Sequence, residues 1–224
     1  MEYAPGQTIP LGMMRKAIIR TVSQSNETIP HFYVWTDVIA DRIIEARQAA
    51  PTESRPSLNA YIVKAAAQTL RRHPGLNATL TDEGIYLLED VNIGIAVAVN
   101  EGLVIPVIRR ADRLSLAETD AAMKDLVHRA RGRRLSPDEY KGGGFTISNL
   151  GMYGIDGFAA IVQPPQAAIL AMGRTRPAWL KTDTGWGEHA VMTMTLSVDH
   201  RIVDGAPAAE FLADLRSALE GGAW

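Results

Sequence analysis

Residues 190–205, AVMTMTLSVDHRIVDG, join an apolar run to a polar turn, and this stretch decides the fold. Apolar side chains in residues 190–199 recur at every second position, which is the period of a β-strand. Residues 206–219 then carry an amphipathic pattern that predicts a helix with the apolar face Phe211, Leu212, Leu215 and Leu219. The turn between strand and helix is therefore expected at the rim of a sheet, where loops commonly present reactive groups.

Helical patterns recur upstream of this stretch. Apolar residues have helical spacing in two segments, Met14-Ala17-Ile18-Val22 and Val38-Ile39-Ile43-Ile44-Ala46. Further helices are expected from the Ser57 cap to Pro74, from the capping box of Ser115 and Glu118 to about Arg131, and briefly after Ser136.

Strand patterns lie between these helices. Strands are expected at residues 31–36, 85–88, 92–99, 103–108, 145–149 and 167–172, with a hairpin turn at residues 100–102. Strands and helices that alternate irregularly predict a mixed sheet with helices against it, an α/β or α+β fold. No repeat or low-complexity linker interrupts the pattern, so residues 1–224 are interpreted as one domain.

The composition excludes several classes of protein. The chain has 23 Lys and Arg against 25 Asp and Glu, so its net charge of −2 gives no reason to expect nucleic acid or a membrane as partner. It has no cysteine, which removes a cysteine nucleophile, disulfides and thiolate metal sites. Neither a signal peptide nor a membrane span is visible, and a cytoplasmic location is the expectation.

The histidines do not predict a metal site, because none of the five forms an HxxxH or HExxH pair. His128 stands beside Arg129, Arg131, Arg133 and Arg134. That basic run is interpreted as a solvated helix end, and contact with the phosphates of a cofactor is the alternative.

His200 has a different setting, because it ends the long strand and opens the pattern His200-x-x-x-Asp204-Gly205. A rigid sheet commonly presents reactive groups in the loops at its strand ends, although this pattern is weak evidence by itself. The alternative is a buried histidine satisfied by a nearby carboxylate, with the glycine needed only for the turn.

Ser148 lies in a second polar segment, residues 142–151, GGGFTISNLG. The segment fits neither the GxSxG elbow of serine hydrolases nor a nucleotide-binding glycine pattern. By themselves, Ser148 and Asn149 are compatible with ordinary strand-end polar groups beside a glycine turn.

Taken together, these segments resemble the catalytic domain of the dihydrolipoamide acyltransferases of 2-oxoacid dehydrogenase complexes, most closely the pyruvate dehydrogenase branch. The matching stretches are IPLGMMRKAI (9–18), TIPHFYV (28–34), LNAYIVKAAAQTLRRHPGLNATL (58–80), NIGIAVAVNEGLVIPVIRRAD (92–112), GGGFTISNLGMYGI (142–155), PPQAAILAMG (164–173) and LSVDHRIVDGAPAAEFL (196–212). They cover nearly the whole chain in the family's order. The resemblance implies a two-layer fold similar to chloramphenicol acetyltransferase.

The resemblance also implies the chemistry. His200 would be the general base that takes a proton from the attacking thiol or hydroxyl and returns it to the leaving CoA thiolate. Ser148 would donate a hydrogen bond to the oxyanion. Asp204 would be a structural ion-pair partner of an arginine, with Arg15, Arg20 and Arg201 as candidates. Acetyl-CoA is the implied cosubstrate, with no metal and no lipoyl group on this chain, and the CoA-contacting residues stay unassigned.

A further implication is a homotrimer with active sites between subunits, where His200 of one protomer faces Ser148 of the next. Longer relatives with two lobes place the site between those lobes, so a single lobe must form it with a neighbour.

Three features depart from the family pattern: no lipoyl or peripheral-subunit-binding domain, no Leu-rich C-terminal tail, and Trp35 in a strand where a smaller residue is usual. An excised domain and a free-standing protein are both compatible with the first. The missing tail favours an isolated trimer, and Trp35 is expected to reshape the acceptor tunnel.

These departures favour a free-standing acetyl-CoA-dependent enzyme that O-acetylates a small-molecule alcohol, as in tetronate antibiotic biosynthesis. The alternative is the dihydrolipoamide acetyltransferase core of a pyruvate dehydrogenase complex, and a scaffold without catalysis is the third reading.

Overall fold

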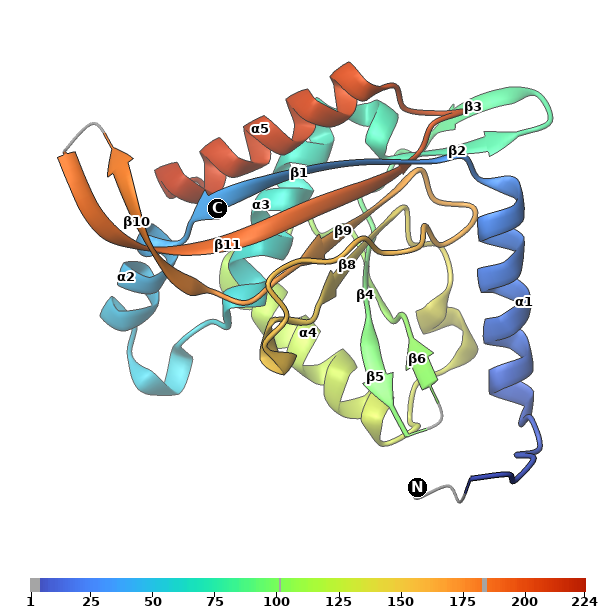
Figure 1. The fold of residues 1–224 in the computed structure, drawn as a ribbon. Coiled ribbons are helices and arrows are strands. Elements are labelled where there is room, and N and C mark those ends of the chain that lie inside the picture. Colours follow the sequence, from blue (N-terminus) through green and yellow to red (C-terminus); the bar gives the residue numbers. More distant parts are fainter. Residues whose placement is uncertain (1–4, 101, 183–184) are drawn as a thin grey trace.

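A computed structural model of the chain describes residues 5–100, 102–182 and 185–224. It has two layers, a twisted mixed sheet and a set of helices packed on one of its faces (Figure 1). The helices are α1 (Met13–Thr28), α2 (Asp41–Ala49), α3 (Leu58–Arg72), α4 (Leu116–Arg131) and α5 (Gly205–Gly221). Short 3-10 turns occur at Thr52–Ser54, Pro74–Leu76, Pro137–Tyr140 and Gly151–Tyr153.

The main sheet has the strand order β1-β11-β9-β8-β4-β7, and β10 pairs with the first part of β11. Its strands are β1 (His31–Ile39), β4 (Ile93–Ile95), β7 (Val107–Ile108), β8 (Phe145–Asn149), β9 (Ala168–Met172), β10 (Arg176–Thr182) and β11 (Gly185–Asp199). Two hairpins lie outside it, formed by β2 (Ala78–Thr81) with β3 (Gly84–Leu87), and by β5 (Val97–Val99) with β6 (Gly102–Val104). The predicted mixed sheet is therefore present.

The core lies between this sheet and α3, α4 and α5. Met192, Met194, Leu196 and Val198 of β11 all face it, so the period of two in the sequence gives the strand one apolar side. Phe145 of β8 and Phe211 of α5 are completely buried, with ring centroids 5.7 Å apart. The opposite face of the sheet is crossed by residues 150–166, the loop in front of β8 and β9 in Figure 1.

The helix caps form as the sequence indicates. The Ser115 side chain accepts a hydrogen bond from the backbone of Glu118, whose carboxylate binds the backbone of Ser115 in return, so the capping box is confirmed. Ser57 caps α3 by accepting from Ala60 at 3.3 Å. Ser57 also donates twice to one carboxylate oxygen of Asp120 on α4, at 2.9 and 2.8 Å, so the two helices are joined at this cap.

One predicted helix begins too early. Val38 and Ile39 have helical spacing with Ile43, yet both lie in β1, which pairs with β11 from His31–Asp199 to Ile39–Val191. The helix begins only at Asp41. Nine residues of backbone pairing outweigh a weak local helical period, so the strand extends to Ile39.

Two predicted strands are each divided. The segment 92–99 splits into β4, which pairs with β8, and β5, which turns out of the sheet to pair with β6. The segment 103–108 splits at Pro106, whose missing N–H cannot serve a ladder. The predicted hairpin between β5 and β6 is confirmed, although residue 101 of its turn lies outside the described residues.

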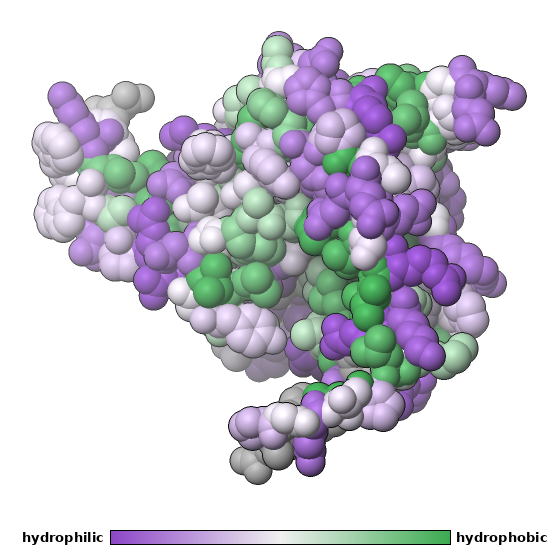
Figure 2. All heavy atoms as spheres, turned by 45° about the vertical axis from the view of Figure 1, so that its right-hand side comes forward, coloured by the Kyte–Doolittle hydropathy of each residue, from purple (hydrophilic) through white to green (hydrophobic). Residues whose placement is uncertain are grey.

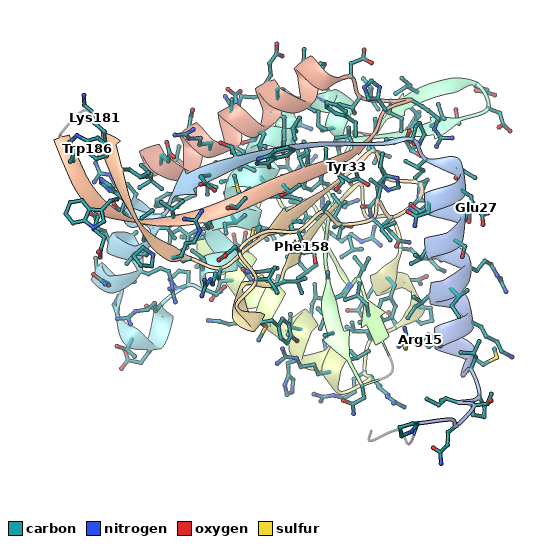
Figure 3. All side chains as sticks on the ribbon, viewed as in Figure 1. Arg15, Glu27, Tyr33, Phe158, Lys181 and Trp186 are labelled. Carbon is teal, nitrogen blue, oxygen red and sulfur yellow. The ribbon has the colours of Figure 1, made fainter. Side chains whose placement is uncertain are left out.

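At the other end of the sheet, β11 begins at Gly185, five residues before the predicted start, and β10 was not predicted. These two strands form a projecting hairpin that ends near Lys181 and Trp186 (Figure 3). Pro177 and the exposed Trp179 obscure the alternation of β10, which explains why the sequence does not reveal the strand.

Helix α1 packs on little of its own chain. Its contacts are mainly with β6, and Met13, Ile19 and Val22 are exposed. Figure 2 shows apolar side chains at the surface on the face that includes this helix. The predicted helix is therefore present, but its apolar residues are not buried within the described chain.

The link between α3 and α4 generates a stability prediction. Asp120 is buried, and burial alone would raise its pKa, but hydrogen bonds from Lys124 and Ser57 outweigh burial and hold the pKa below its ordinary value. We expect Asp120→Asn to lower the free energy of unfolding at pH 7 by about 1–3 kcal/mol, because Lys124 loses its anion and the Ser57 contacts weaken. Urea denaturation measures this change.

The pH dependence has a definite sign. Because the folded-state pKa is lowered, the stabilisation is present above the ordinary value of about 3.9 and is lost as the pH falls through the folded value. The difference between variant and wild type should therefore shrink below about pH 4. Asp125→Asn, an exposed carboxylate of the same helix, is the control and should change stability by under about 0.5 kcal/mol. Equal losses in both variants would contradict the prediction.

Candidate active site

His200 occupies the turn between β11 and α5. Its backbone N–H donates to the carbonyl of Pro30 at 3.0 Å, which ties the turn to the segment that enters β1. The imidazole lies edge-on to Phe32, with ring centroids 5.0 Å apart, and its side chain is 43% exposed. The ring is thus fixed on one side and accessible on the other, so the buried-histidine alternative is wrong.

Asp199 anchors the same turn from the buried side. Its side chain is almost completely buried and accepts from the Arg201 guanidinium at 2.6 and 2.9 Å and from the Arg201 backbone N–H at 3.0 Å. These bonds raise the pKa of Arg201. Arg201 was one of three candidate partners of Asp204, and the structure pairs it instead with the buried carboxylate of Asp199.

Asp204 stands close to His200 rather than to an arginine of its own turn. Its Oδ1 lies 3.7 Å from His200 Nδ1, which is too long for a hydrogen bond, and its side chain is 84% exposed. Arg15, another candidate partner, lies at the end of α1 beside β6, whereas Glu27 lies at the end that leads to Pro30 (Figure 3). The pairing of Asp204 with Arg15 or Arg20 stays a prediction.

Ser148 lies one residue before the end of β8, half-buried. Phe145 and Ile147 of this strand face the helix layer, so alternation points Ser148 to the opposite face. It lines a cavity of about 550 Å³ where the carboxyl ends of the parallel strands β4 and β8 separate. Such an opening is the usual ligand position in sheets with parallel strands.

The cavity extends from α3, α4 and the β5–β6 hairpin past the end of β8 to the turn at Gly151–Tyr153, which belongs to the loop that crosses the opposite face of the sheet. Its wall is mostly apolar, and Met152 and Tyr153 are exposed at its edge. The polar lining residues are Ser57, Asn59, Lys124, His128, Arg131, Ser148 and Asn149.

Within a single protomer, His200 and Ser148 lie far apart. Ser148 lies in register with Ala171 of β9, which lies in register with Thr195 of β11. His200 is five residues beyond Thr195 and two strands away, which places the two residues on the order of 20 Å apart. His200 is also not among the residues that line the cavity.

Two arginines of the predicted basic run, Arg129 and Arg134, are held by local contacts. Arg129 binds Asp125 and Glu139, and the hydrogen bond from Arg129 lowers the pKa of Glu139 to about 2. Arg134 contacts His128 at 2.6 Å. These contacts favour the helix-end interpretation, although His128 and Arg131 also reach the cavity.

No three histidine, aspartate or glutamate side chains among the described residues lie close enough together to hold a metal ion. In the same part of the chain, no helix combines the length and apolar character needed to cross a membrane. Trp35 is 71% exposed on β1 and does not line the cavity, so its predicted effect on an acceptor tunnel is not visible in one chain.

Two residues of this site were missed from the sequence. Asn59 Oδ1 accepts a hydrogen bond from Asn149 Nδ2 at 2.7 Å, although the two lie 90 positions apart. Asn149 does carry a local sequence signal, since it follows Ser148 at a strand end. No sequence pattern distinguishes Asn59, which lies within a helix.

Comparison with known proteins identifies the family. The model of the 2-oxoacid dehydrogenases acyltransferase (catalytic domain) family matches residues 3–223. The chain belongs to this family. A curated relative of the acyltransferase domain, the dihydrolipoyllysine-residue acetyltransferase component of the pyruvate dehydrogenase complex of Rickettsia bellii, is 38% identical over 217 residues. That match covers 94% of this chain and 52% of the relative, so the domain spans about half the length of such a protein.

Solved structures of relatives share the fold over nearly the whole domain. A probable dihydrolipoamide acetyltransferase from Listeria monocytogenes has a TM-score of 0.93 at 31% identity, covering 98% of this chain and 96% of that one. The cubic core of a pyruvate dehydrogenase multienzyme complex also has a TM-score of 0.93, at 28% identity, with 97% and 93% covered. Chloramphenicol acetyltransferase, at 11% identity and a TM-score of 0.56, shares the fold alone, as predicted.

A third structure concerns the site. It is the dihydrolipoamide acetyltransferase of Azotobacter vinelandii, with a TM-score of 0.92 at 27% identity, covering 96% of this chain and 91% of that one. That study addresses the role of a serine, a histidine and an asparagine in its catalytic mechanism. The serine precedes the histidine by 52 positions, and the asparagine follows the histidine by four.

The two carboxylates of the His200 turn are predicted to differ in their effect on stability. Asp199→Asn should lower the free energy of unfolding by about 1–3 kcal/mol, because it leaves the buried end of the Arg201 bond without a charged acceptor. Asp204→Asn, in the same turn but exposed, is the matched control and should stay within about 0.5 kcal/mol of wild type. Thermal or chemical denaturation checks both, and a larger loss at Asp204 would contradict this assignment.

Proposed function

We propose that this domain transfers an acetyl group between CoA and a dihydrolipoyl group, with His200 as general base and Ser148 as oxyanion donor. The observation that carries the proposal is the spacing of the polar residues. Ser148 precedes His200 by 52 positions and Asp204 follows it by four, which are the spacings in the Azotobacter enzyme. By this spacing, Asp204 stands at the position of the asparagine in that enzyme.

The residues support a direct transfer between two thiols. His200 takes the proton of the attacking thiol, and the sulfur forms a bond to the carbonyl carbon of the acyl thioester. The oxygen of the resulting tetrahedral intermediate carries the negative charge, and the Ser148 hydroxyl donates a hydrogen bond to it. The carbon–sulfur bond to the first carrier then breaks, and its thiolate receives the proton from His200. No covalent enzyme intermediate is needed, which agrees with a chain that lacks cysteine.

The site is proposed to form between protomers of a homotrimer. Three observations support this: His200 and Ser148 lie on the order of 20 Å apart in one chain, the His200 ring is partly exposed, and α1 leaves apolar residues uncovered. A closed ring of three copies would place the His200 of each protomer against the Ser148 of the next.

The relatives favour the lipoyl acceptor over a small-molecule alcohol. The Rickettsia and Azotobacter proteins are named as dihydrolipoyllysine-residue and dihydrolipoamide acetyltransferases, and none of the relatives described supports O-acetylation in natural-product biosynthesis. The sequence-based preference for the alcohol rested on where the given sequence begins and ends and on Trp35, and none of these features identifies the acceptor. Retention of both His200 and Ser148 is also hard to reconcile with a scaffold that lacks catalysis.

Activity gives the first test of the proposal. Purified protein with acetyl-CoA and dihydrolipoamide should form S-acetyl-dihydrolipoamide, detected by mass spectrometry. Ser148→Ala should reduce the rate about 10²–10³-fold, because it removes one oxyanion donor, and His200→Ala about 10²–10⁴-fold, because it removes the base. No S-acetyl product from protein that still binds acetyl-CoA would overturn the choice of acceptor.

Mixing the two inactive variants tests the site between protomers. Trimers co-assembled from equal amounts of the Ser148→Ala and His200→Ala chains contain some sites with an intact histidine from one chain and an intact serine from the next. Random mixing should therefore restore about a quarter of the wild-type activity. The variants measured separately are the control, and a mixture no more active than either alone would show that each site lies within one chain.

A further inference from the structure

The strand that carries Ser148 loses a neighbour just before it reaches the serine. The parallel register between β4 and β8 runs from Ile93–Phe145 to Ile95–Ile147, and the next backbone bond, from Ala96 N–H to the Ile147 carbonyl, is the last. From Val97 onward the chain turns away to pair with β6. On that side the cavity opens, and Ser148 and Asn149 have no partner strand.

On the other side the strand end is held firmly. Ser148 and Asn149 remain in register with Ala171 and Met172 of β9. The following Gly151 packs so closely on the end of β9 that a Cβ would come within 2.8 Å of the Gly173 carbonyl oxygen. The strand end is therefore paired and closely packed on the β9 side, and it lacks backbone pairing on the side of the cavity.

Asn149 spans this open side with its side chain. Its Nδ2 donates to Asn59 Oδ1 at 2.7 Å, and its Oδ1 accepts from the Gly151 N–H at 2.7 Å. One amide therefore connects the strand to α3 and also fixes the turn that follows. Earlier along β8 the strand is held by backbone hydrogen bonds to β4. Beyond the end of that ladder, the side-chain bonds of Asn149 hold it.

The anchor on α3 is itself fixed. Asn59 lies in the first turn of the helix, two residues after the Ser57 cap. Ser57 is bound to Asp120, and Asp120 is bound to Lys124 at 2.5 Å. Two sets of polar contacts, Lys124–Asp120–Ser57 and Asn59–Asn149, are therefore joined through the backbone of the first turn of α3, and most of these residues line the cavity.

Because side chains alternate along β8, the residue that anchors the strand end and the residue that supplies the hydroxyl lie on opposite faces. Asn149 points toward α3, so its neighbour Ser148 projects from the opposite face of the strand. Through their shared backbone, the Asn59–Asn149 bond sets where the Ser148 hydroxyl stands. We infer that Asn59 and Asn149 are positioning residues for the oxyanion donor, which act on the reaction through Ser148; this rests on the proposed role of Ser148.

The inference predicts coupling between Asn149 and Ser148. Asn149→Ala should lower kcat about 10- to 100-fold with little change in KM for CoA, because it disturbs a group used in the transition state. In the Ser148→Ala background the same substitution should have almost no further effect on kcat, since the hydroxyl it positions is gone. If the two losses multiply, Asn149 acts independently of Ser148 and the inference is overturned.

Variants of Asn59 separate the hydrogen bond from packing. Asn59→Ala should reproduce the loss in kcat, whereas Asn59→Asp keeps an acceptor for Asn149 Nδ2 at a helix start that favours a carboxylate, and should retain near-wild-type kcat. Equal losses in both would overturn the inference. Gln68→Ala, an exposed amide on the same helix, is the control and should leave kcat unchanged.

Two further readouts make the outcomes distinct. The melting temperature and the oligomeric state of every variant show whether a loss of kcat comes from unfolding; a loss that follows unfolding alone contradicts positioning. If Ser148→Ala itself leaves kcat unchanged, the proposed oxyanion role fails. If Ser148→Ala slows transfer and Asn149→Ala does not couple to it, only the positioning role fails.

Discussion

The backbone ladder of β11 is the constraint on which the rest of the structure depends. This strand pairs with β1 along one edge and with β10 and then β9 along the other, so it unites the first and last parts of the chain in one sheet. Its even-numbered side chains from Met192 to Val198 form the centre of the core under α3 and α5. Where the ladder ends, at Asp199, the buried pair with Arg201 begins. His200 is thus held by a rigid element on one side and by an ion pair on the other.

Much of this framework could be predicted from the sequence. The period of two in residues 190–199, the Ser57 and Ser115 caps and the apolar face of α5 are local signals, and each corresponds to an observed element. Predictions failed where pairing with a distant strand decided the outcome. Ile39 is drawn into β1 by β11, and residues 92–99 divide because β8 pairs with only their first part.

The residues of the site also divide into those with local sequence signals and those whose role depends on a distant partner. His200 opens a short HxxxDG pattern, but the roles of His200 and Ser148 came from the family resemblance, and the matching spacing in a relative supports those roles. Asn59 was missed because its significance comes only from a partner 90 positions away. Arg201 was kept as a candidate partner of Asp204 for the same reason, since no spacing rule shows that the buried Asp199 binds it.

The opposite orientations of Ser148 and Asn149 limit how this segment can evolve. A strand alternates strictly, so a single residue inserted between Phe145 and Ser148 would turn the hydroxyl toward α3 and the amide toward the open face. Substitutions could be accommodated one at a time, but a change in length would reverse the orientations of the hydroxyl and the amide together. Variation in length is more easily absorbed in the β2–β3 hairpin, which stands outside the main sheet (Figure 1). We therefore expect related chains to differ in length at such hairpins and to keep β8 constant in length.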